Sequence, residues 1–265
     1  MYAALLLMTL AVWALLWFPR PLPGVTRAPP LLIGHRGVRG GLPENSVAAF
    51  ERALEAGLDG LETDVQCALG GEIVLVHDTA LPDGRKVAEL HPDDLEAAIP
   101  TLATLGELFA VARRYPGVLI NLELKTQSWR TQGLERRTVH AVRASGLAGQ
   151  TLISSFNPLS LLRVRLRAPE LRVALLYAPD GPRGLRSNAS ALLWARLLHC
   201  DALHPHHSLV TPALVRAAAR ARVPLNVWTV NVAERVGELV RLNVNGLMAD
   251  DPEALQDAVG HAGSR

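Results

Sequence analysis

Residues 31–65 read LLIGHRGVRGGLPENSVAAFERALEAGLDGLETDV, and this stretch decides the fold class. It begins with the apolar run LLIGH at residues 31–35 and ends with GLETDV at residues 60–65, both typical of buried strands. Between them, NSVAAFERALEAG at residues 45–57 has the spacing of an amphipathic helix that opens with capping residues and closes at a glycine. The stretch therefore predicts a strand–helix–strand unit of a parallel sheet.

The same alternation of short apolar runs and helical segments continues along the chain. Eight predicted strands cover residues 31–35, 60–65, 118–125, 151–156, 172–177, 201–206, 224–230 and 245–250. Eight such units in 265 residues fit a TIM barrel, an α/β fold, as a single domain over residues 31–259 with a short tail at 260–265. A further extended segment, IVLVHD at residues 73–78, is expected to continue from the second strand through a tight turn at Gly70-Gly71.

Composition and charge exclude several classes of protein. Hydrophobic residues make up 49% and charged residues 20% of the chain, which is typical of a globular body. The 27 basic and 25 acidic residues form no basic stripe, so nucleic acid is not an expected partner. The two cysteines, Cys67 and Cys200, are too few for a disulfide scaffold and lack the C-x-x-C spacing of redox or zinc sites.

The first eighteen residues, MYAALLLMTLAVWALLWF, contain no charged side chain. Their length is close to the lower limit of about 17 residues for a spanning helix, and Trp13 and Trp17 stand where an interfacial aromatic belt would form. No basic residue precedes the run and no small-x-small cleavage site follows it, which favours an uncleaved membrane anchor over a signal peptide. The Pro-rich residues 19–30 are then expected to be a linker, whose two arginines favour the cytoplasmic side; a secreted form is the alternative.

Working residues of a TIM barrel lie at the C-terminal ends of its strands, and several of these ends are polar here. Glu62 and Asp64 alternate along one strand and share a face, and Glu123 and Lys125 do the same on the strand at residues 118–125. Three carboxylates that converge at one end of a barrel repel one another unless a cation or a shared proton intervenes, and oxygen ligands suit Mg²⁺, Ca²⁺ or Mn²⁺. One divalent metal ion is therefore expected.

Two histidines and two cations accompany the carboxylates. His35 and Arg36 follow the first strand between glycines, and His77 lies near the end of the extra extended segment. Arg36 suits bidentate recognition of phosphate, and Lys125 suits the charge that develops on it. Most single histidines are structural, whereas two of them beside three carboxylates indicate a functional role.

The motifs IGHRG, LPENSVAAFERALEAGLDGLETDVQ, GGEIVLVHD, INLELK, ISSFNP and NVWTVN resemble, in order and spacing, the glycerophosphodiester phosphodiesterase family over roughly residues 31–255. The resemblance implies a hydrolase of glycerol and lipid metabolism that converts glycerophosphodiesters to glycerol 3-phosphate and an alcohol. It implies that the divalent cation is held by Glu62, Asp64 and Glu123. It also implies that the two histidines, at 35 and 77, are the general acid and base, without saying which is which.

Four further residues match family positions. Glu44 and Asn45 precede the first helix and are expected to support the site from behind, with helix capping as the alternative for Asn45. Phe156 and Trp228 end two strands and are expected to line the pocket and contact glycerol or the leaving group, with core packing as the alternative.

Two features lie outside the family pattern. The last strand ends in Ala249-Asp250-Asp251-Pro252 where the family usually shows Thr-Asp-x-Pro, so no role is carried over for that threonine. The histidines at positions 204, 206 and 207 belong to none of the matching motifs, and a substrate contact competes with a structural role there.

Two alternative functions compete with hydrolysis of soluble glycerophosphodiesters. A lysophospholipase D-type activity on membrane lysolipids would fit the apolar N-terminus, which would keep the pocket close to lipid. A barrel that binds phosphodiesters or sugar phosphates without turnover would use the same basic groups. The presence of both histidines and all three carboxylates argues against such a receptor. In each case the expected partner is a small molecule.

Overall fold

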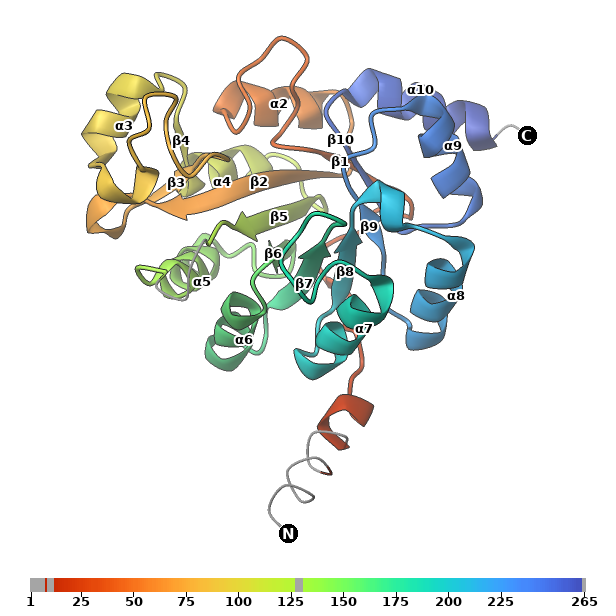
Figure 1. The fold of residues 1–265 in the computed structure, drawn as a ribbon. Coiled ribbons are helices and arrows are strands. Elements are labelled where there is room, and N and C mark those ends of the chain that lie inside the picture. The colour runs from red at the N-terminus through yellow and green to blue at the C-terminus, as the bar shows by residue number, and fades with distance from the viewer. Residues whose placement is uncertain (1–7, 9–11, 127–130, 264–265) are drawn as a thin grey trace.

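The computed structural model describes the chain except for residues 1–7, 9–11, 127–130 and 264–265, and it shows a barrel of parallel strands surrounded by helices (Figure 1). The barrel strands are β1 (Leu31–Gly34), β2 (Gly60–Cys67), β5 (Leu119–Leu124), β6 (Thr151–Ser155), β7 (Arg172–Tyr177), β8 (Ala202–Pro205), β9 (Asn226–Val227) and β10 (Gly246–Ala249). The helices between and after them are α2 (Val47–Glu55), α4 (Leu105–Arg113), α5 (Leu134–Ser145), α6 (Pro158–Arg167), α7 (Asn188–Leu197), α8 (Pro212–Ala221), α9 (Ala233–Arg241) and α10 (Pro252–Gly263).

Neighbouring barrel strands follow the order β8-β7-β6-β5-β2-β1-β10-β9, and each neighbouring pair is parallel. The ring closes between β8 and β9, where parallel bridges pair Leu203 with Leu225 and His206 with Trp228. All eight predicted strands are present, so the predicted TIM barrel is confirmed.

Alternation along the strands separates two apolar layers. One set of strand side chains packs against the surrounding helices in the large core; Leu61, Leu122 and Leu203 belong to it. The opposite set points into the barrel and forms a smaller cluster made by Ile33, Leu119, Leu152, Ala174, Ala202 and Met248. The interior is therefore filled by side chains, and the polar groups of the candidate site lie towards the C-terminal ends of the strands.

An antiparallel arm extends from β2 before the chain returns to the barrel. β3 (Ile73–Leu75) pairs with β2, and β4 (Ala103–Thr104) pairs with β3. The remaining elements of the arm are η1 (Leu69–Gly71), η2 (Val87–Glu89) and α3 (Pro92–Ala98). The predicted extended segment at residues 73–78 is thus confirmed as a strand over its first three residues, and a small core of its own supports the arm.

The segment expected to be a linker, residues 19–30, packs across the end of the barrel at which the strands begin. The Arg20 guanidinium donates to Asp201 just before β8, with Nε 2.9 Å from the carboxylate. The backbone N–H of Gly24 donates to the carbonyl of Gly149 before β6 (2.9 Å), and other side chains of the segment pack against the cluster inside the barrel. The segment covers apolar strand ends that water would otherwise reach, which is why it is ordered rather than a free linker.

The predicted membrane segment lies partly outside the described residues, but its last residues contact the barrel. Trp17 is buried, and its indole N–H donates to the carbonyl of Cys200 (2.7 Å). Trp13 donates to the carbonyl of Leu197 and stacks on His199 with ring centroids 4.0 Å apart. The two indoles therefore donate to carbonyls at the end of α7 and just beyond it, and the expected aromatic belt stays a prediction. Within the part of the chain that the structure describes, no helix combines the length and the apolarity needed to cross a bilayer.

Candidate active site

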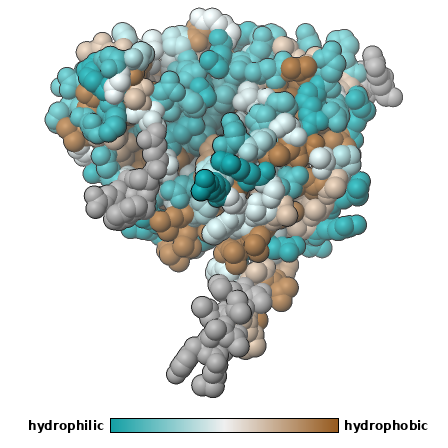
Figure 2. Space-filling view, viewed as in Figure 1, coloured by the Kyte–Doolittle hydropathy of each residue, from teal (hydrophilic) through white to brown (hydrophobic). Residues whose placement is uncertain are grey.

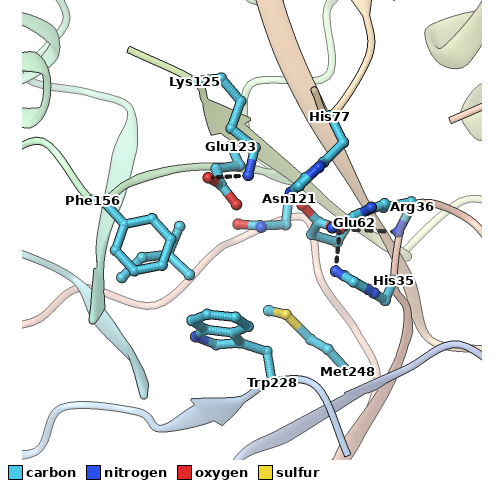
Figure 3. Close-up of a pocket in the computed structure, with 11 residues that line it drawn as sticks. His35, Arg36, Glu62, His77, Asn121, Glu123, Lys125, Phe156, Trp228 and Met248 are labelled. Carbon is cyan, nitrogen blue, oxygen red and sulfur yellow. Dashed lines mark hydrogen bonds and ion pairs between the residues drawn. The ribbon is translucent and has the colours of Figure 1, made fainter. Parts of the chain in front are cut away.

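The turn after β1 carries two of the predicted site residues. It folds tightly because Gly34 and Gly37 lie against each other: a Cβ on Gly34 would stand 2.0 Å from the Gly37 carbonyl oxygen, and Gly37 has a φ of +80° that favours glycine. The backbone N–H of His35 donates to the carbonyl of Ala249 in β10 (2.9 Å). The turn thus delivers His35 and Arg36 to the same opening (Figure 3).

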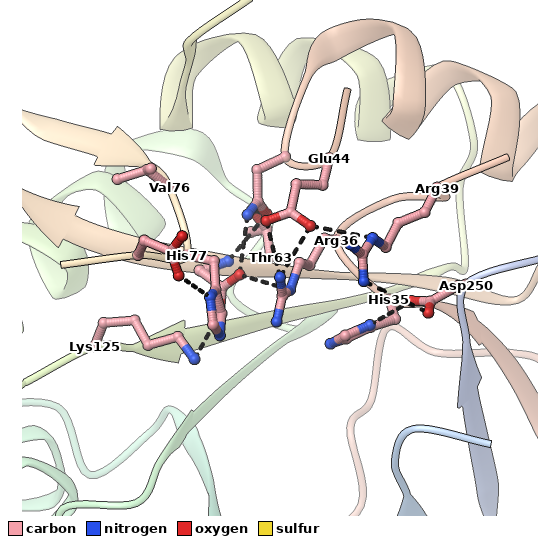
Figure 4. Close-up of polar contacts among 12 residues, drawn as sticks. His35, Arg36, Arg39, Glu44, Thr63, Val76, His77, Lys125 and Asp250 are labelled. Carbon is pink, nitrogen blue, oxygen red and sulfur yellow. Dashed lines mark hydrogen bonds and ion pairs between the residues drawn. The ribbon is translucent and has the colours of Figure 1, made fainter. Parts of the chain in front are cut away.

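The imidazole of His35 is held by a carboxylate at the end of β10. Its Nδ1 lies 2.7 Å from Asp250 Oδ1 (Figure 4). Asn231 donates to the other oxygen of Asp250 at 2.7 Å. The opposite ring nitrogen, Nε2, lies 4.0 Å from Glu62. Burial lowers the pKa of His35, but the hydrogen bond to Asp250 and the charge of Glu62 outweigh burial and raise it above its usual value. Sequence reasoning assigned no role to Asp250; its place at the end of the last barrel strand, which neighbours β1, was the available signal.

The three predicted metal ligands converge. One carboxylate oxygen from each of Glu62, Asp64 and Glu123 lies within 4.8 Å of the others, and all three side chains are buried. Asp64 and Glu123 are register partners on the neighbouring strands β2 and β5. Burial, followed by the charge of Asp64, raises the pKa of Glu62, and burial raises the pKa of Glu123 although Lys125 opposes it. Such crowding of buried oxygen ligands is relieved by a hard divalent cation, so the residues fit one.

Both predicted phosphate-binding cations line the cavity, and both pair with carboxylates of the site. Lys125 Nζ lies 2.7 Å from Glu123 and 3.0 Å from Asp64. Arg36 donates through Nη1 to both oxygens of Glu44, at 2.8 and 2.9 Å, and its Nε lies 3.3 Å from Asp64. Burial raises the pKa of Asp64, but these two cations outweigh it and hold that pKa below its usual value. Asp64 is therefore ionised at neutral pH.

Of the two residues expected to support the site, Glu44 orients Arg36, whereas the structure corrects one alternative for Asn45. The N-cap of α2 is Ser46, whose hydroxyl accepts from the N–H of Ala49 at 3.2 Å. Asn45 has a φ of +55° and turns inward, so its amide donates to Asp64 (2.9 Å) and accepts from the hydroxyl of Thr63 (2.7 Å). Capping by Asn45 is thus wrong, and the residue holds Asp64, one of the three predicted metal ligands, instead.

His77 reaches the site from the arm. Hydrogen bonding between the Val76 N–H and the Asp64 carbonyl (3.1 Å) continues the pairing of β3 with β2, which brings the imidazole beside the carboxylates. Burial and the charge of Lys125 lower the pKa of His77. The buried amide of Gln66 donates to the carbonyls of Val76, His77 and Asp78 at 2.8, 3.2 and 2.9 Å. Sequence reasoning missed Gln66, although it is the last residue of the motif that contains Glu62 and Asp64.

Opposite the charged groups, the cavity has an apolar wall. The rings of Phe156 and Trp228 meet edge to face with centroids 5.5 Å apart, and Leu176 and Met248 complete the wall (Figure 3). The cavity between the two walls has a volume of about 120 Å³. Both aromatic residues thus line the pocket, as the sequence predicted.

The amide of Asn121, which sequence reasoning missed, also lines the cavity. Asn121 is buried on β5 two residues before Glu123, and its Nδ2 donates to Ser154 (3.1 Å). Its Oδ1 has no hydrogen-bond partner among the described residues. An unpaired buried acceptor is costly unless a ligand or water satisfies it. The alternation with Glu123 and Lys125 was the signal that places Asn121 on the same face.

The histidines at 204, 206 and 207 stand outside the cavity lining. His204 is fully buried, its Nε2 lies 3.1 Å from the amide of Asn226, and burial lowers its pKa to about 3, so it is neutral. His206 packs edge to face on Trp228 at 5.3 Å, and His207 packs against His206. His204 adjoins the pocket through its strand pairing with Leu176 and through the Trp228 indole, which donates to its carbonyl.

Comparisons with known proteins agree with this geometry. The glycerophosphoryl diester phosphodiesterase family matches residues 35–254. A glycerophosphodiester phosphodiesterase of Caldanaerobacter subterraneus is 32% identical over 250 residues, which cover 88% of this chain and 99% of that protein. Another, from Bacillus altitudinis, is 25% identical over 244 residues, covering 84% and 95%.

Solved structures agree as well. A phosphodiesterase of Oleispira antarctica in complex with the product sn-glycerol-3-phosphate is 26% identical, with a TM-score of 0.71, and the match covers 87% of this chain and 97% of that one. A glycerophosphodiester phosphodiesterase of Parabacteroides distasonis has the same fold, with 24% identity, a TM-score of 0.77 and coverage of 90% and 100%. The matches therefore span the barrel and the motifs of the site together.

Proposed function

The chain belongs to the glycerophosphoryl diester phosphodiesterase family and hydrolyses glycerophosphodiesters to glycerol 3-phosphate, and we propose that one divalent cation and a histidine pair carry out this reaction. The observation that carries the proposal is the meeting of three buried carboxylates and two imidazoles at one cavity. Every predicted site residue lies at this cavity or touches a residue that does.

Glu62, Asp64 and Glu123 would hold the cation, with Mg²⁺, Ca²⁺ and Mn²⁺ as the candidates. When bound, such a cation neutralises phosphodiester charge and polarises the phosphoryl group. Arg36 and Lys125 add positive charge on the same side, while Asn45 and Glu44 hold Asp64 and Arg36 in place.

His35 and His77 are proposed as the acid–base pair because both line the cavity beside the carboxylates. A phosphodiester has a poor alkoxide leaving group, so its hydrolysis needs one group to deprotonate the attacking oxygen and another to protonate the departing one. Asp250 holds the His35 ring through Nδ1, which leaves Nε2 directed to the reacting atoms. Asp78 lies 2.8 Å from Nδ1 of His77 and has the same effect there.

The substrate's carbon skeleton fits the apolar wall. Phe156 and Trp228 offer ring faces and edges to the glycerol backbone, while phosphate lies toward the charged wall. The Asn121 Oδ1 is an acceptor, so it pairs with a hydroxyl of glycerol and not with a phosphate oxygen, which carries no proton at neutral pH. A glycerophosphodiester supplies both kinds of group.

The test is hydrolysis of a panel of glycerophosphodiesters by metal-free protein to which single metals are returned. Activity is expected to vanish in excess chelator and to return with at least one of Mg²⁺, Ca²⁺ or Mn²⁺. His35→Ala is expected to lower kcat by at least a hundredfold while cation binding persists. His207→Ala, outside the cavity, is the matched control. Full activity in chelator, or unchanged turnover of His35→Ala, contradicts the proposed mechanism.

A further inference from the structure

Apolar side chains stand exposed where the N-terminal segment leaves the barrel. Leu15, Leu16 and Phe18 are 79%, 59% and 68% exposed. In Figure 2 this segment is brown at the edge of the molecule. It is the last part of residues 1–18, which contain no charged side chain. Soluble surfaces seldom gather so many large apolar residues unless they meet a partner.

Three arginines line a hollow beside this apolar segment. The hollow beside it is lined by Leu15, Trp17, Phe18, Arg196, Arg220 and Arg222 together with two alanines, and none of its described lining residues is acidic. Arg196 also lies over the Trp17 ring, 5.9 Å from its centroid. The hollow therefore combines apolar and cationic groups.

The arginines belong to a wider ring that the barrel's architecture creates. Each of the helices α2 and α4 to α9 has an exposed arginine in its last turn: Arg52, Arg113, Arg143, Arg167, Arg196, Arg220 and Arg241. Helix dipoles favour cations at that place. Because the helices run antiparallel to the strands, all these helix ends meet at the end of the barrel where the strands begin.

The apolar segment is fixed to this same end. Arg20 is bound to Asp201 before β8, and its Nη groups donate to the carbonyls of Pro169 and Leu171 before β7. Thr26 donates to the carbonyl of Gly117 before β5 (3.2 Å). The site lies at the other ends of the strands, and a strand as long as β2, with eight residues, spans about 26 Å.

We propose that the strand-start end of the barrel docks on an anionic lipid bilayer, with the exposed side chains of Leu15, Leu16 and Phe18 in the acyl boundary and the arginine ring on the head groups. Burial of the apolar side chains in the bilayer favours membrane binding. Attraction of the arginines to anionic head groups gives the preference for negatively charged lipids. The cavity then faces away from the bilayer that carries the protein. If the proposed function holds, this orientation gives the cavity access to water-soluble glycerophosphodiesters and keeps it away from lysolipids embedded in the same bilayer.

Docking is tested by flotation of the full chain with vesicles of phosphatidylcholine, alone or with one third phosphatidylglycerol. We expect a preference for the anionic vesicles that Arg196→Gln, Arg220→Gln and Arg222→Gln together reduce by roughly a hundredfold. Leu15→Ser, Leu16→Ser and Phe18→Ser together are expected to weaken binding to both vesicles. All these side chains are exposed, so the fold is retained.

The matched controls are Val232→Ser and Arg85→Gln, which change exposed residues on the loop after β9 and on the arm. Equal flotation of the arginine variant and the parent chain overturns the docking surface. So does a lipid-free dimer that the three serine substitutions dissociate, because a second copy would then cover the apolar residues. His35→Ala is expected to float like the parent chain, so docking is scored without catalysis.

Orientation is tested with bound protein. Hydrolysis of soluble glycerophosphocholine is expected to change less than about twofold on vesicle binding, because the cavity stays open to water. Lysophosphatidylcholine in the same vesicles is expected to be hydrolysed no faster by bound than by unbound protein. A tenfold gain on the embedded lysolipid that the serine variant loses overturns the orientation. Flotation without hydrolysis of any glycerophosphodiester contradicts the proposed function alone.

Discussion

At the scale of single residues, the site is a set of charged side chains that pair with one another. Lys125 holds Asp64 and Glu123, Arg36 holds Glu44, and Asp250 holds His35. Each carboxylate in this set costs free energy to bury, and its partner offsets that cost. The protonation state of each group therefore depends on its neighbour more than on its own chemistry.

Asp250→Asn tests this dependence at His35. Because the carboxylate raises the pKa of His35 above 6.5, the variant is expected to lower it, as an NMR titration of metal-free protein would show. Because the pKa of His35 is higher in the folded protein than in the unfolded chain, protonated His35 stabilises the fold below pH 6.5. This stabilisation is lost as pH rises through the pKa of His35 in the folded protein. At pH 6 the free energy of unfolding of the variant should therefore be about 1.5 kcal/mol lower than that of the parent chain. This difference should shrink above pH 8. An unchanged His35 titration contradicts the assignment.

Cation binding should release protons. Burial and the charge of Asp64 raise the pKa of Glu62 from 4.5 to about 8 without metal. Metal-free protein thus keeps protons at neutral pH that a cation must displace, so affinity should fall as pH drops from 8 towards 5. Because the pKa of Glu62 is raised, the free energy of unfolding of the metal-free protein should fall as pH rises towards that pKa. Added metal should therefore raise Tm more at pH 8 than at pH 5.5. Calorimetry in buffers of different ionisation enthalpy measures the released protons.

At the scale of elements, two adjacent residues at the start of α2 have different roles: one stabilises the helix and the other contacts the site. Ser46 caps the helix, and Asn45 faces the opposite way toward Asp64. The antiparallel arm has a similar division, since its strands give it rigidity and Gln66 fixes the loop that carries His77. In each case one polar side chain holds a group of the candidate site that comes from a distant position in the chain.

Ser46→Ala and Asn45→Ala make a matched pair. Loss of the cap should cost about 1 kcal/mol in urea unfolding and leave kinetic constants nearly unchanged. Asn45→Ala should lower metal affinity by about 10- to 100-fold because Asp64 loses the amide that orients it. Equal effects of the two substitutions on metal affinity would mean that Asn45 has no role beyond the turn.

At the scale of the whole molecule, the barrel works with two different ends. One end gathers the polar site, and the other is covered by residues 19–30 and ringed by arginines. Asp201 ties the covering segment to the barrel through Arg20 and Arg165, at 2.9 and 2.6 Å. Stability and catalysis are thus separated along the barrel axis, as is usual for this fold.

Arg20→Ala tests the separation. It removes bonds to the buried Asp201 and should lower the free energy of unfolding by about 1.5–3 kcal/mol, with Arg165 limiting the loss. kcat/KM should stay within about twofold because the change lies at the other end of the barrel. Arg27→Ala is the control: Arg27 is half exposed and 3.9 Å from Asp59, so its loss should cost at most about 0.5 kcal/mol. A large fall in kcat/KM for Arg20→Ala would show that the two ends are coupled.

The amino-acid sequence by itself determined the eight strand–helix units and the residues that share a strand face. Glu62 with Asp64 and Glu123 with Lys125 were predictable because alternation along one strand is a local property. The fold then brings the ends of parallel strands together, so the convergence of these pairs was predictable as well. The inward turn of Asn45 was not, because Ser46 competes with it for the cap.

Only the tertiary structure decided the contacts between distant parts of the chain. His35 and Asp250 are 215 positions apart, and Arg20 and Asp201 are 181 apart. His35 and Asp250 meet because β1 pairs with β10 when the barrel closes, whereas Arg20 reaches Asp201 because residues 19–30 cross the end of the barrel where the strands begin. The same closure turned a Pro-rich stretch that reads as a linker into the cover of one barrel end, since only the assembled barrel offers the apolar surface on which it packs.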